Sequence, residues 1–200
     1  MIFLTKGKRG RIYIDKDIAI KQTNKERAKK EAYYLKLLNK YKIGPKLLYL
    51  KKDKIFYKFV KGPFILDYIK KNNTKSIMKI IKNILNQCRT LDKLKINKLE
   101  LHNPHKHIII EQKKVGIGNK PIMIDFERAY KTEHPKNVTQ FCQYLMSFDI
   151  YNTLFSKGIN INKRELIKSL KVYKKKQTNS NFKNILIIIF KKNSKCTVQK

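Results

Sequence analysis

This sequence of 200 residues has no tryptophan, only three cysteines, and only 14 acidic residues against 48 lysines and arginines. Cys88, Cys142 and Cys196 are far apart and form no CxxC pair, which argues against a disulfide framework and indicates a reducing compartment. The longest apolar run, residues 185–190, is far shorter than the roughly 20 residues that span a bilayer. Residues 1–10 lack the apolar stretch and cleavage site of a signal peptide. We therefore expect a soluble, cytoplasmic protein with no membrane partner.

The composition is otherwise that of a folded protein with an unusual charge. A hydrophobic fraction of 42% and an aromatic fraction of 10% supply enough apolar surface for one packed unit. The formal net charge of +34 attracts polyanions, and this favours RNA or the ribosome as a partner through a basic surface. The alternative is genome drift, because lysine, isoleucine and asparagine are encoded by A/T-rich codons. Both interpretations remain open from the sequence.

Short strands and a single helix are predicted in the first 60 residues. Apolar and β-branched residues bounded by Gly and Asp clusters indicate strands at residues 2–5, 11–14, 18–22, 46–50 and 54–59. Between the third and fourth strands, Ala28, Ala32, Leu35 and Leu38 recur at helical spacing. This spacing predicts an amphipathic helix over residues 24–40, with Asn24 as its N-cap.

The rest of the chain is predicted to be mostly helical, after a hinge at Gly62 and Pro63. Helices are expected at residues 76–94, 138–154, 163–174 and 182–191. Apolar runs at 108–110 and 122–124 flank a turn at 116–119, which predicts a β-hairpin. We expect an α+β fold of two lobes, with these domains: a β-rich N-lobe with one helix (1–61), a reduced helical C-lobe that includes the hairpin (62–192), and a polar, frayed tail (193–200).

The first string with chemical content is Ile18-Ala19-Ile20-Lys21. A turn containing Gly7 and Gly10 precedes it by one strand, and a helix bearing Glu31 follows it. In protein kinases, a phosphate-covering loop, a phosphate-binding lysine and a glutamate that positions this lysine occur in the same order. Glu31 lies among apolar helix positions and is favoured over the rival Glu26. The two glycines supply only part of a GxGxxG pattern.

The second string is residues 121–129, PIMIDFERA, which place Asp125 at the end of a buried strand. In kinases the corresponding segment reads DFG, and its aspartate coordinates the Mg²⁺ that bridges the nucleotide phosphates. The alternative is an aspartate that caps a turn. Glu127 stands where kinases usually have glycine, and it either stiffens the segment or adds a second acidic ligand.

These strings, together with GKRGRIY, EAYYLKLLN, FVKGPFILDYI, PHKHIII and PKNVTQF, resemble a group of small predicted archaeal Ser/Thr protein kinases. That group is related to the RIO-type kinases and to the kinase of the tRNA-modifying KEOPS complex. The resemblance runs from Gly7 to about Leu154. It implies a bilobal kinase-like fold that binds ATP and Mg²⁺ in its cleft, and a protein phosphoacceptor.

The catalytic loop departs from the kinase pattern HxDxxxxN, in which the aspartate accepts the substrate proton and the asparagine holds a second Mg²⁺. Residues 100–108 read ELHNPHKHI. Alignment with the hairpin strand puts His102 where the aspartate belongs and His107 where the asparagine belongs. His107 is therefore the candidate second metal ligand beside Asp125, and Lys106 is a candidate to stabilise the transferring phosphate.

Three interpretations of this loop are open. In the first, Glu100 or His102 is the catalytic base. In the second, the loop is degenerate and the protein binds nucleotide without transferring phosphate. In the third, His102, His105 and His107 form a metal site, although their spacing matches no known structural zinc motif.

The function predicted from the sequence is therefore an ATP-dependent phosphotransferase acting on Ser or Thr of a protein, including itself. The alternatives are a catalytically degenerate, basic RNA- or ribosome-binding pseudokinase and a small-molecule kinase. Arg89, Asp92 and the NVTQF string (residues 137–141) are expected to be structural, at the end of one helix and the start of the next.

Overall fold

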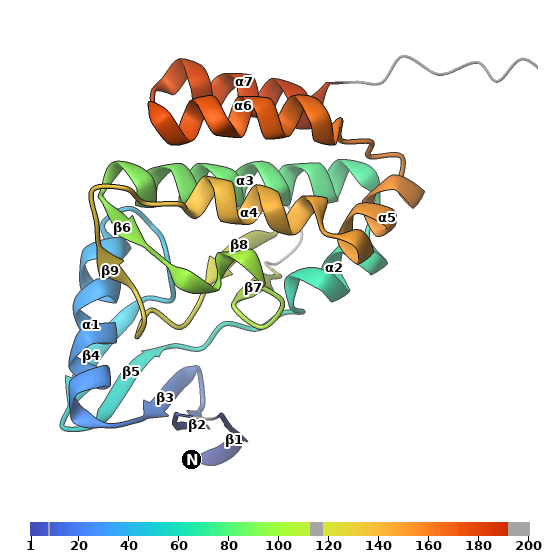
Figure 1. The fold of residues 1–200 in the computed structure, drawn as a ribbon. Coiled ribbons are helices and arrows are strands. Elements are labelled where there is room, and N and C mark those ends of the chain that lie inside the picture. Colours follow the sequence, from blue (N-terminus) through green and yellow to red (C-terminus); the bar gives the residue numbers. More distant parts are fainter. Residues whose placement is uncertain (8, 113–117, 192–200) are drawn as a thin grey trace, which may run out of the picture.

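The computed structural model describes residues 1–7, 9–112 and 118–191. The expected polar tail, Cys196, and two residues of the expected hairpin turn, Gly116 and Ile117, lie outside these ranges. The fold is α+β, as predicted: a strand-rich first part with one helix, followed by a largely helical second part (Figure 1).

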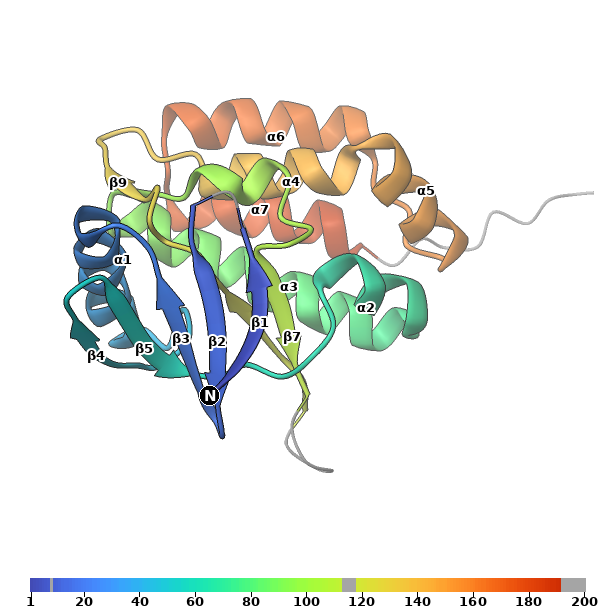
Figure 2. The same ribbon diagram turned by 90° about the horizontal axis from the view of Figure 1, so that it is seen from below.

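A single antiparallel sheet forms the first part, with strand order β1-β2-β3-β5-β4. Figure 2 shows this sheet at the front of the molecule, with α1 beside β4 and β5. β3 lies at its centre and pairs with β2 on one side and β5 on the other, so side chains on β3 are held on both flanks. The elements are β1 (Ile2–Lys6), β2 (Arg11–Asp15), β3 (Ile18–Gln22), α1 (Lys25–Asn39), β4 (Leu47–Lys51) and β5 (Lys54–Lys58).

Helix α1 begins where the sequence predicted it to begin. The Asn24 side chain accepts a 2.9 Å hydrogen bond from the backbone N–H of Arg27, which is the N-cap geometry. Its apolar positions form the buried face, and Leu35 and Leu38 are fully buried in the core. Glu31 lies on this same buried face.

The second part stacks helices in layers. Figure 1 shows α6 and α7 above α3 and α4, which in turn lie above the β7–β8 hairpin. The helices are α2 (Ile65–Lys71), α3 (Thr74–Lys93), α4 (Asn137–Met146), α5 (Phe148–Ser156), α6 (Lys163–Lys175) and α7 (Asn179–Phe190). Short elements connect them: β6 (Ile96–Asn97), the 3₁₀ helix η1 (Leu99–His102), β7 (Ile108–Glu111), β8 (Lys120–Met123) and β9 (Tyr130–Lys131).

Helices α3 and α4 are joined by a buried polar network. Asp92, near the end of α3, is 1% exposed and accepts hydrogen bonds from the backbone N–H groups of Asn137 and Val138 at the start of α4. It also accepts from the Asn137 side chain at 2.7 Å and from the Tyr173 hydroxyl at 2.8 Å. Asp92 thus caps the first turn of α4 from a neighbouring helix.

One of the expected helices is divided in two, and α2, η1, β6 and β9 are additions to the predicted elements. A single helix was expected over residues 138–154, and the structure has two helices that are separated at Ser147. Ser147 has an extended backbone (ψ 149°), and both its hydroxyl and its N–H donate to the carbonyl of Tyr144. Local bonds of this kind compete with helix continuation, and no Pro or Gly marks the break in the sequence.

No helix among the described residues combines the length and the hydropathy that crossing a membrane requires. Two of the cysteines, Cys88 and Cys142, are buried and free.

Candidate active site

The Lys21 side chain is the centre of a buried charged cluster. Strand alternation puts Lys21 on the same face of β3 as Ala19, and the residue is only 8% exposed. Its Nζ lies 2.7 Å from Oε2 of Glu31, 3.0 Å from Oδ1 of Asp125 and 3.5 Å from Oε2 of Glu127. One ammonium group therefore joins the central strand of the sheet, helix α1 and the segment after β8.

Glu31, and not Glu26, is the glutamate of α1 that contacts Lys21. Glu31 is 2% exposed, and its second oxygen accepts a hydrogen bond from the backbone N–H of Phe126 at 3.3 Å. Glu26 lies on the outer face of the helix and pairs with Lys29. Both oxygens of Glu31 are thus bound, which fixes the carboxylate and with it the direction of the lysine.

Asp125 enters the cluster through an unusual backbone conformation. Its φ is 64°, in the left-handed region that only a few non-glycine residues adopt. Ile124 donates a backbone hydrogen bond to His107 at 2.9 Å, which holds the strand end against the loop before β7. Phe126 is fully buried directly after it. These contacts hold the carboxylate toward Lys21.

The charges of this cluster follow from burial and proximity. Burial alone would lower the pKa of Lys21, but the charges and hydrogen bonds of Glu31 and Asp125 raise it above its ordinary value. Burial tends to raise the pKa of Asp125, and the cations Lys21 and Lys98 outweigh it and lower that pKa. Burial raises the pKa of Glu31, which Lys21 only partly counteracts. At neutral pH Lys21 is therefore protonated and Asp125 is ionised.

Three carboxylates in this cluster are arranged so that they could hold a cation. One oxygen from each of Glu31, Asp125 and Glu127 lies within 4.8 Å of the others. Oε2 of Glu127 is buried and accepts no hydrogen bond from the residues that the structure describes. Hard carboxylate oxygens with free acceptor capacity suit Mg²⁺, so the residues present fit the predicted metal. Asp125 is the most accessible of them, with its side chain 32% exposed.

The turn between β1 and β2 contacts this cluster through Arg9, whose Nη1 lies 3.2 Å from Oε1 of Glu127. It contains a hydrogen bond from the N–H of Gly7 to the carbonyl of Gly10, and the Thr23 hydroxyl donates to the carbonyl of Arg9 at 2.7 Å. A Cβ at Gly10 would lie 2.5 Å from the backbone oxygen of Gln22, so only glycine permits this close approach. Gly7 is exposed, and a Cβ there would make only an ordinary contact, 3.9 Å from the backbone oxygen of Gly10.

A buried lysine that no local sequence pattern marks contacts the predicted catalytic loop at Glu100. Lys98 is fully buried, and its Nζ lies 3.0 Å from Oε2 of Glu100. The same Nζ donates to the backbone oxygen of Asp125 and lies 4.9 Å from the ring centre of Phe126. Glu100 is 8% exposed and its other oxygen lies 3.9 Å from Nε of Arg128. Only the burial of Lys98 distinguishes it from the other lysines, and the local sequence does not reveal that.

The histidines of the loop do not come together. His102 is exposed, and its Nδ1 lies 2.8 Å from the carbonyl oxygen of Leu99 in its own turn. His105 packs edge-on against Tyr144. Among the described residues, only the three carboxylates group at metal-binding distance. The interpretation of the three histidines as one metal site is therefore wrong.

His107 does lie beside Asp125, while Lys106 is exposed. Nδ1 of His107 is 3.9 Å from Oδ2 of Asp125 and has no hydrogen-bond partner among the described residues. Burial and the nearby charge of Lys98 lower the pKa of His107, so the imidazole is neutral at neutral pH. A neutral ring nitrogen with a free lone pair is a competent metal ligand.

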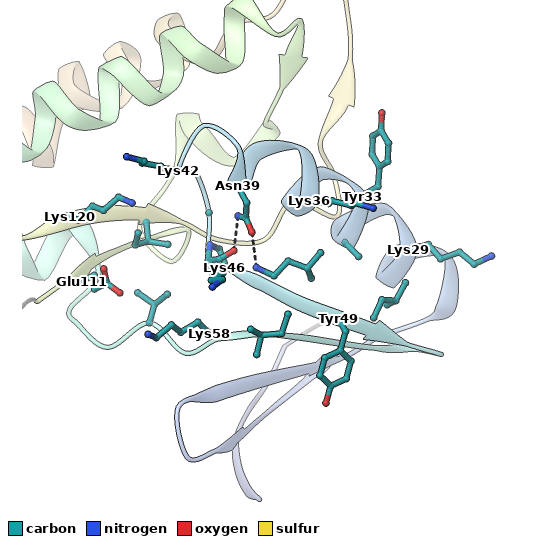
Figure 3. A pocket seen from close by; sticks show the side chains of 18 residues that line it. Lys29, Tyr33, Lys36, Asn39, Lys42, Lys46, Tyr49, Lys58, Glu111 and Lys120 are labelled. Atoms are coloured by element: carbon teal, nitrogen blue, oxygen red, sulfur yellow. Dashed lines mark hydrogen bonds between the residues drawn. The ribbon is translucent and has the colours of Figure 1, made fainter.

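A wide groove of about 970 Å³ lies elsewhere, between α1, β4 and the start of β8 (Figure 3). Lys21, Asp125 and Glu127 are not among its lining residues. This groove is therefore separate from the charged cluster.

The sequence matches no family model and no curated protein. The fold, in contrast, is similar to that of protein kinases of the RIO type. The crystal structure of the Rio2 kinase from Chaetomium thermophilum matches with a TM-score of 0.57 and a sequence identity of 12%. The match covers 94% of this chain and 72% of that chain. The ADP/Mg²⁺-phosphoaspartate complex of the same kinase gives 14% identity and a TM-score of 0.55, over 94% and 70% of the two chains. This chain therefore has a RIO-kinase-like fold.

Proposed function

We propose that this protein is an ATP-dependent phosphotransferase that acts on Ser or Thr of a protein, itself included. The observation that carries the proposal is the contact of Lys21 with both Glu31 and Asp125 at 2.7 and 3.0 Å. In a kinase site the same three residue types hold the nucleotide phosphates and Mg²⁺. The fold is that of proteins whose structures include a complex with ADP and Mg²⁺.

The residues then have distinct roles. Lys21 binds the phosphates of ATP, and Glu31 orients Lys21. Asp125 holds Mg²⁺, with His107 or Glu127 as a further ligand. When bound, Mg²⁺ supplies positive charge that offsets the charge developing on the transferred phosphate. Because phosphoryl transfer depends mainly on positioning and charge, an atypical loop is compatible with activity.

Glu100 is the better candidate for the base. The Lys98 ammonium donates both to the Glu100 carboxylate and to the backbone oxygen of Asp125, which places Glu100 near the segment that carries Asp125. The imidazole of His102 is exposed and bonded within its own turn. A base must reach the substrate hydroxyl beside the metal-binding aspartate, and the position of Glu100 favours it.

A thermal-shift series tests the nucleotide site. Mg-ATP at about 100 times its dissociation constant should stabilise the wild-type protein by roughly 2.7 kcal/mol, or about 5–11 °C. Lys21→Ala and Asp125→Ala should lose most of this shift while remaining folded by circular dichroism. Lys51→Ala, an exposed lysine at the end of β4, serves as the control and should keep the full shift. An unchanged shift in both site variants would refute the assignment.

RNA binding is a second candidate, and the groove of Figure 3 is the observation that favours it. Glu111 is the one acidic residue among its lining positions. Six lysines line it: Lys29, Lys36, Lys42, Lys46, Lys58 and Lys120. Binding through phosphate contacts weakens steeply with salt. A filter-binding titration with a labelled RNA at 50 and 200 mM salt tests this. Weak binding that does not change with salt would refute RNA binding as a role of these lysines.

A further inference from the structure

A single ion pair connects the glycine turn to the segment that carries Asp125. Nη1 of Arg9 lies 3.2 Å from Oε1 of Glu127, although the two residues are 118 positions apart in the sequence. The Glu127 side chain is 4% exposed and the Arg9 side chain is 44% exposed. The carboxylate is therefore held in the protein interior, and the guanidinium beside it is partly exposed to solvent.

The backbone of Arg9 is held in place independently of this ion pair. The hydroxyl of Thr23, just before α1, donates a hydrogen bond to the carbonyl of Arg9. Gly10 allows the turn to approach Gln22 more closely than any side chain would permit. Both contacts draw the turn down toward β3, and Arg9 consequently points toward the cluster around Lys21.

Glu127 stands where the kinase pattern DFG has a glycine and thus no side chain. Here this position supplies a buried carboxylate that contacts two cations, Arg9 at 3.2 Å and Lys21 at 3.5 Å. Glu127 is buried, and the Arg9 end of this ion pair is 44% exposed, so solvent screens the pair in part. Its consequence is positional, because it places a second cation beside Lys21.

A guanidinium is well suited to bind phosphate. It carries five N–H donors in a planar fork that matches two phosphate oxygens, and its charge does not depend on pH. Only Nη1 of Arg9 is engaged with a side chain among the described residues. The remaining donors are therefore available to a ligand while Glu127 keeps its hold on Nη1.

We propose that Arg9 is a second phosphate-binding cation of the nucleotide site, which contacts the terminal phosphates of a nucleoside triphosphate, and that Glu127 is the residue that positions it. This inference rests on the proposed ATP site and adds two residues to it. It assigns Gly10 an indirect role, because the close approach of Gly10 to Gln22 shapes the turn that presents Arg9.

The test compares nucleotides that differ only in phosphate number. Binding of Mg-ATP, Mg-ADP and AMP is measured by isothermal titration calorimetry on wild type, Arg9→Ala, Arg9→Lys and Arg11→Ala. Arg9→Ala should weaken ATP binding about 10–100-fold, the usual effect of losing a charge-assisted hydrogen bond. ADP binding should weaken less and AMP binding should not change. Arg9→Lys should be intermediate, because an ammonium lacks the fork.

Arg11→Ala is the matched control, because Arg11 is an exposed arginine at the start of β2, two positions from Arg9. It should bind all three nucleotides as the wild type does. Glu127→Gln keeps the shape of the side chain and should also weaken ATP binding, by less than Arg9→Ala. If Glu127 acts through Arg9, the double variant should lose less affinity than the product of the two single losses.

Two results would overturn the inference. One is an Arg9→Ala variant that binds ATP as tightly as the wild type. The other is an equal loss for AMP and ATP, which would mean that the substitution disrupts the turn and removes no phosphate contact. Failure of the wild-type protein to bind Mg-ATP is a different result, and it would refute the proposed function itself.

Discussion

Lys21 donates a 3.0 Å hydrogen bond to Asp125, and the two residues lie 104 positions apart in the chain. One belongs to the central strand of the sheet and the other follows the β7–β8 hairpin. The contact brings the proposed phosphate-binding cation and the proposed metal-binding anion to one place. Every functional prediction below depends on this meeting of two distant segments.

The first prediction concerns Asp125 itself. Asp125→Asn should reduce phosphate transfer from ATP by about 10³-fold or more, because stabilisation by a bound metal contributes several kcal/mol. Transfer is measured with radiolabelled ATP, as autophosphorylation or on a general protein substrate. The variant should stay folded, because an amide of the same shape still accepts the hydrogen bond from Lys21. Transfer at the wild-type rate would exclude Asp125 as the metal ligand.

The second prediction separates the two candidate bases. Glu100→Gln should lower kcat by about 10²–10⁴-fold, the usual contribution of general-base catalysis, and leave ATP affinity nearly unchanged. Glutamine still accepts a hydrogen bond from Lys98, so the loop keeps its shape. His102→Gln, on the exposed side of the same 3₁₀ turn, should have little effect on kcat. The opposite ranking of the two variants would assign the base to His102.

The third prediction is a metal preference set by His107. Nitrogen ligands favour Mn²⁺ over Mg²⁺ more than oxygen ligands do, and Nδ1 of His107 lies unpartnered near Asp125. In thermal-shift titrations with ADP, the wild-type protein should be stabilised more by Mn²⁺ than by Mg²⁺. His107→Asn should shift this preference toward Mg²⁺ by about tenfold in affinity, or about 1.4 kcal/mol.

His102→Asn is the control for this experiment, because it makes the same substitution at an exposed histidine. It should leave the ratio of the two metal affinities unchanged. Equal Mn²⁺ and Mg²⁺ preferences in wild type and His107→Asn would show that the imidazole does not bind the metal.

Local patterns in the sequence were sufficient to predict most of the fold. Helical spacing located α1, and Asn24 predicted its first residue, because capping depends on neighbouring residues only. The same spacing placed Glu31 on the buried face, opposite Lys21. The apolar runs at 108–110 and 122–124 likewise located β7 and β8, which pair in the antiparallel manner of a hairpin. These features need no knowledge of distant contacts.

Other features depend on tertiary contacts that no motif in the sequence indicates, and these could not be predicted. Lys98 is one of 48 basic residues, and only its burial between Glu100 and Phe126 distinguishes it. The contact of Arg9 with Glu127 spans most of the described chain. The helix ends at Ser147 because the hydroxyl and the N–H of Ser147 both donate to the carbonyl of Tyr144. No glycine or proline marks this break in the sequence.

The fourth prediction tests the structural role of Asp92. Asp92→Ala leaves buried donors at Asn137, Val138 and Tyr173 without an acceptor, so it should destabilise the protein by about 3 kcal/mol. The melting temperature should fall by about 6–12 °C for a chain of this size.

The control and the ligand response distinguish structure from function at this position. Asp149→Ala, at an exposed position in the first turn of α5, should change the melting temperature by little. The folded Asp92→Ala protein should still be stabilised by Mg-ATP as much as the wild type, because Asp92 bonds α4 and α6 and has no contact with Lys21 or Asp125 in the described chain. Loss of the ATP response at a temperature where the variant is folded would instead place Asp92 in the nucleotide site. A melting temperature equal to that of the wild type would mean that the cap on α4 contributes nothing to stability.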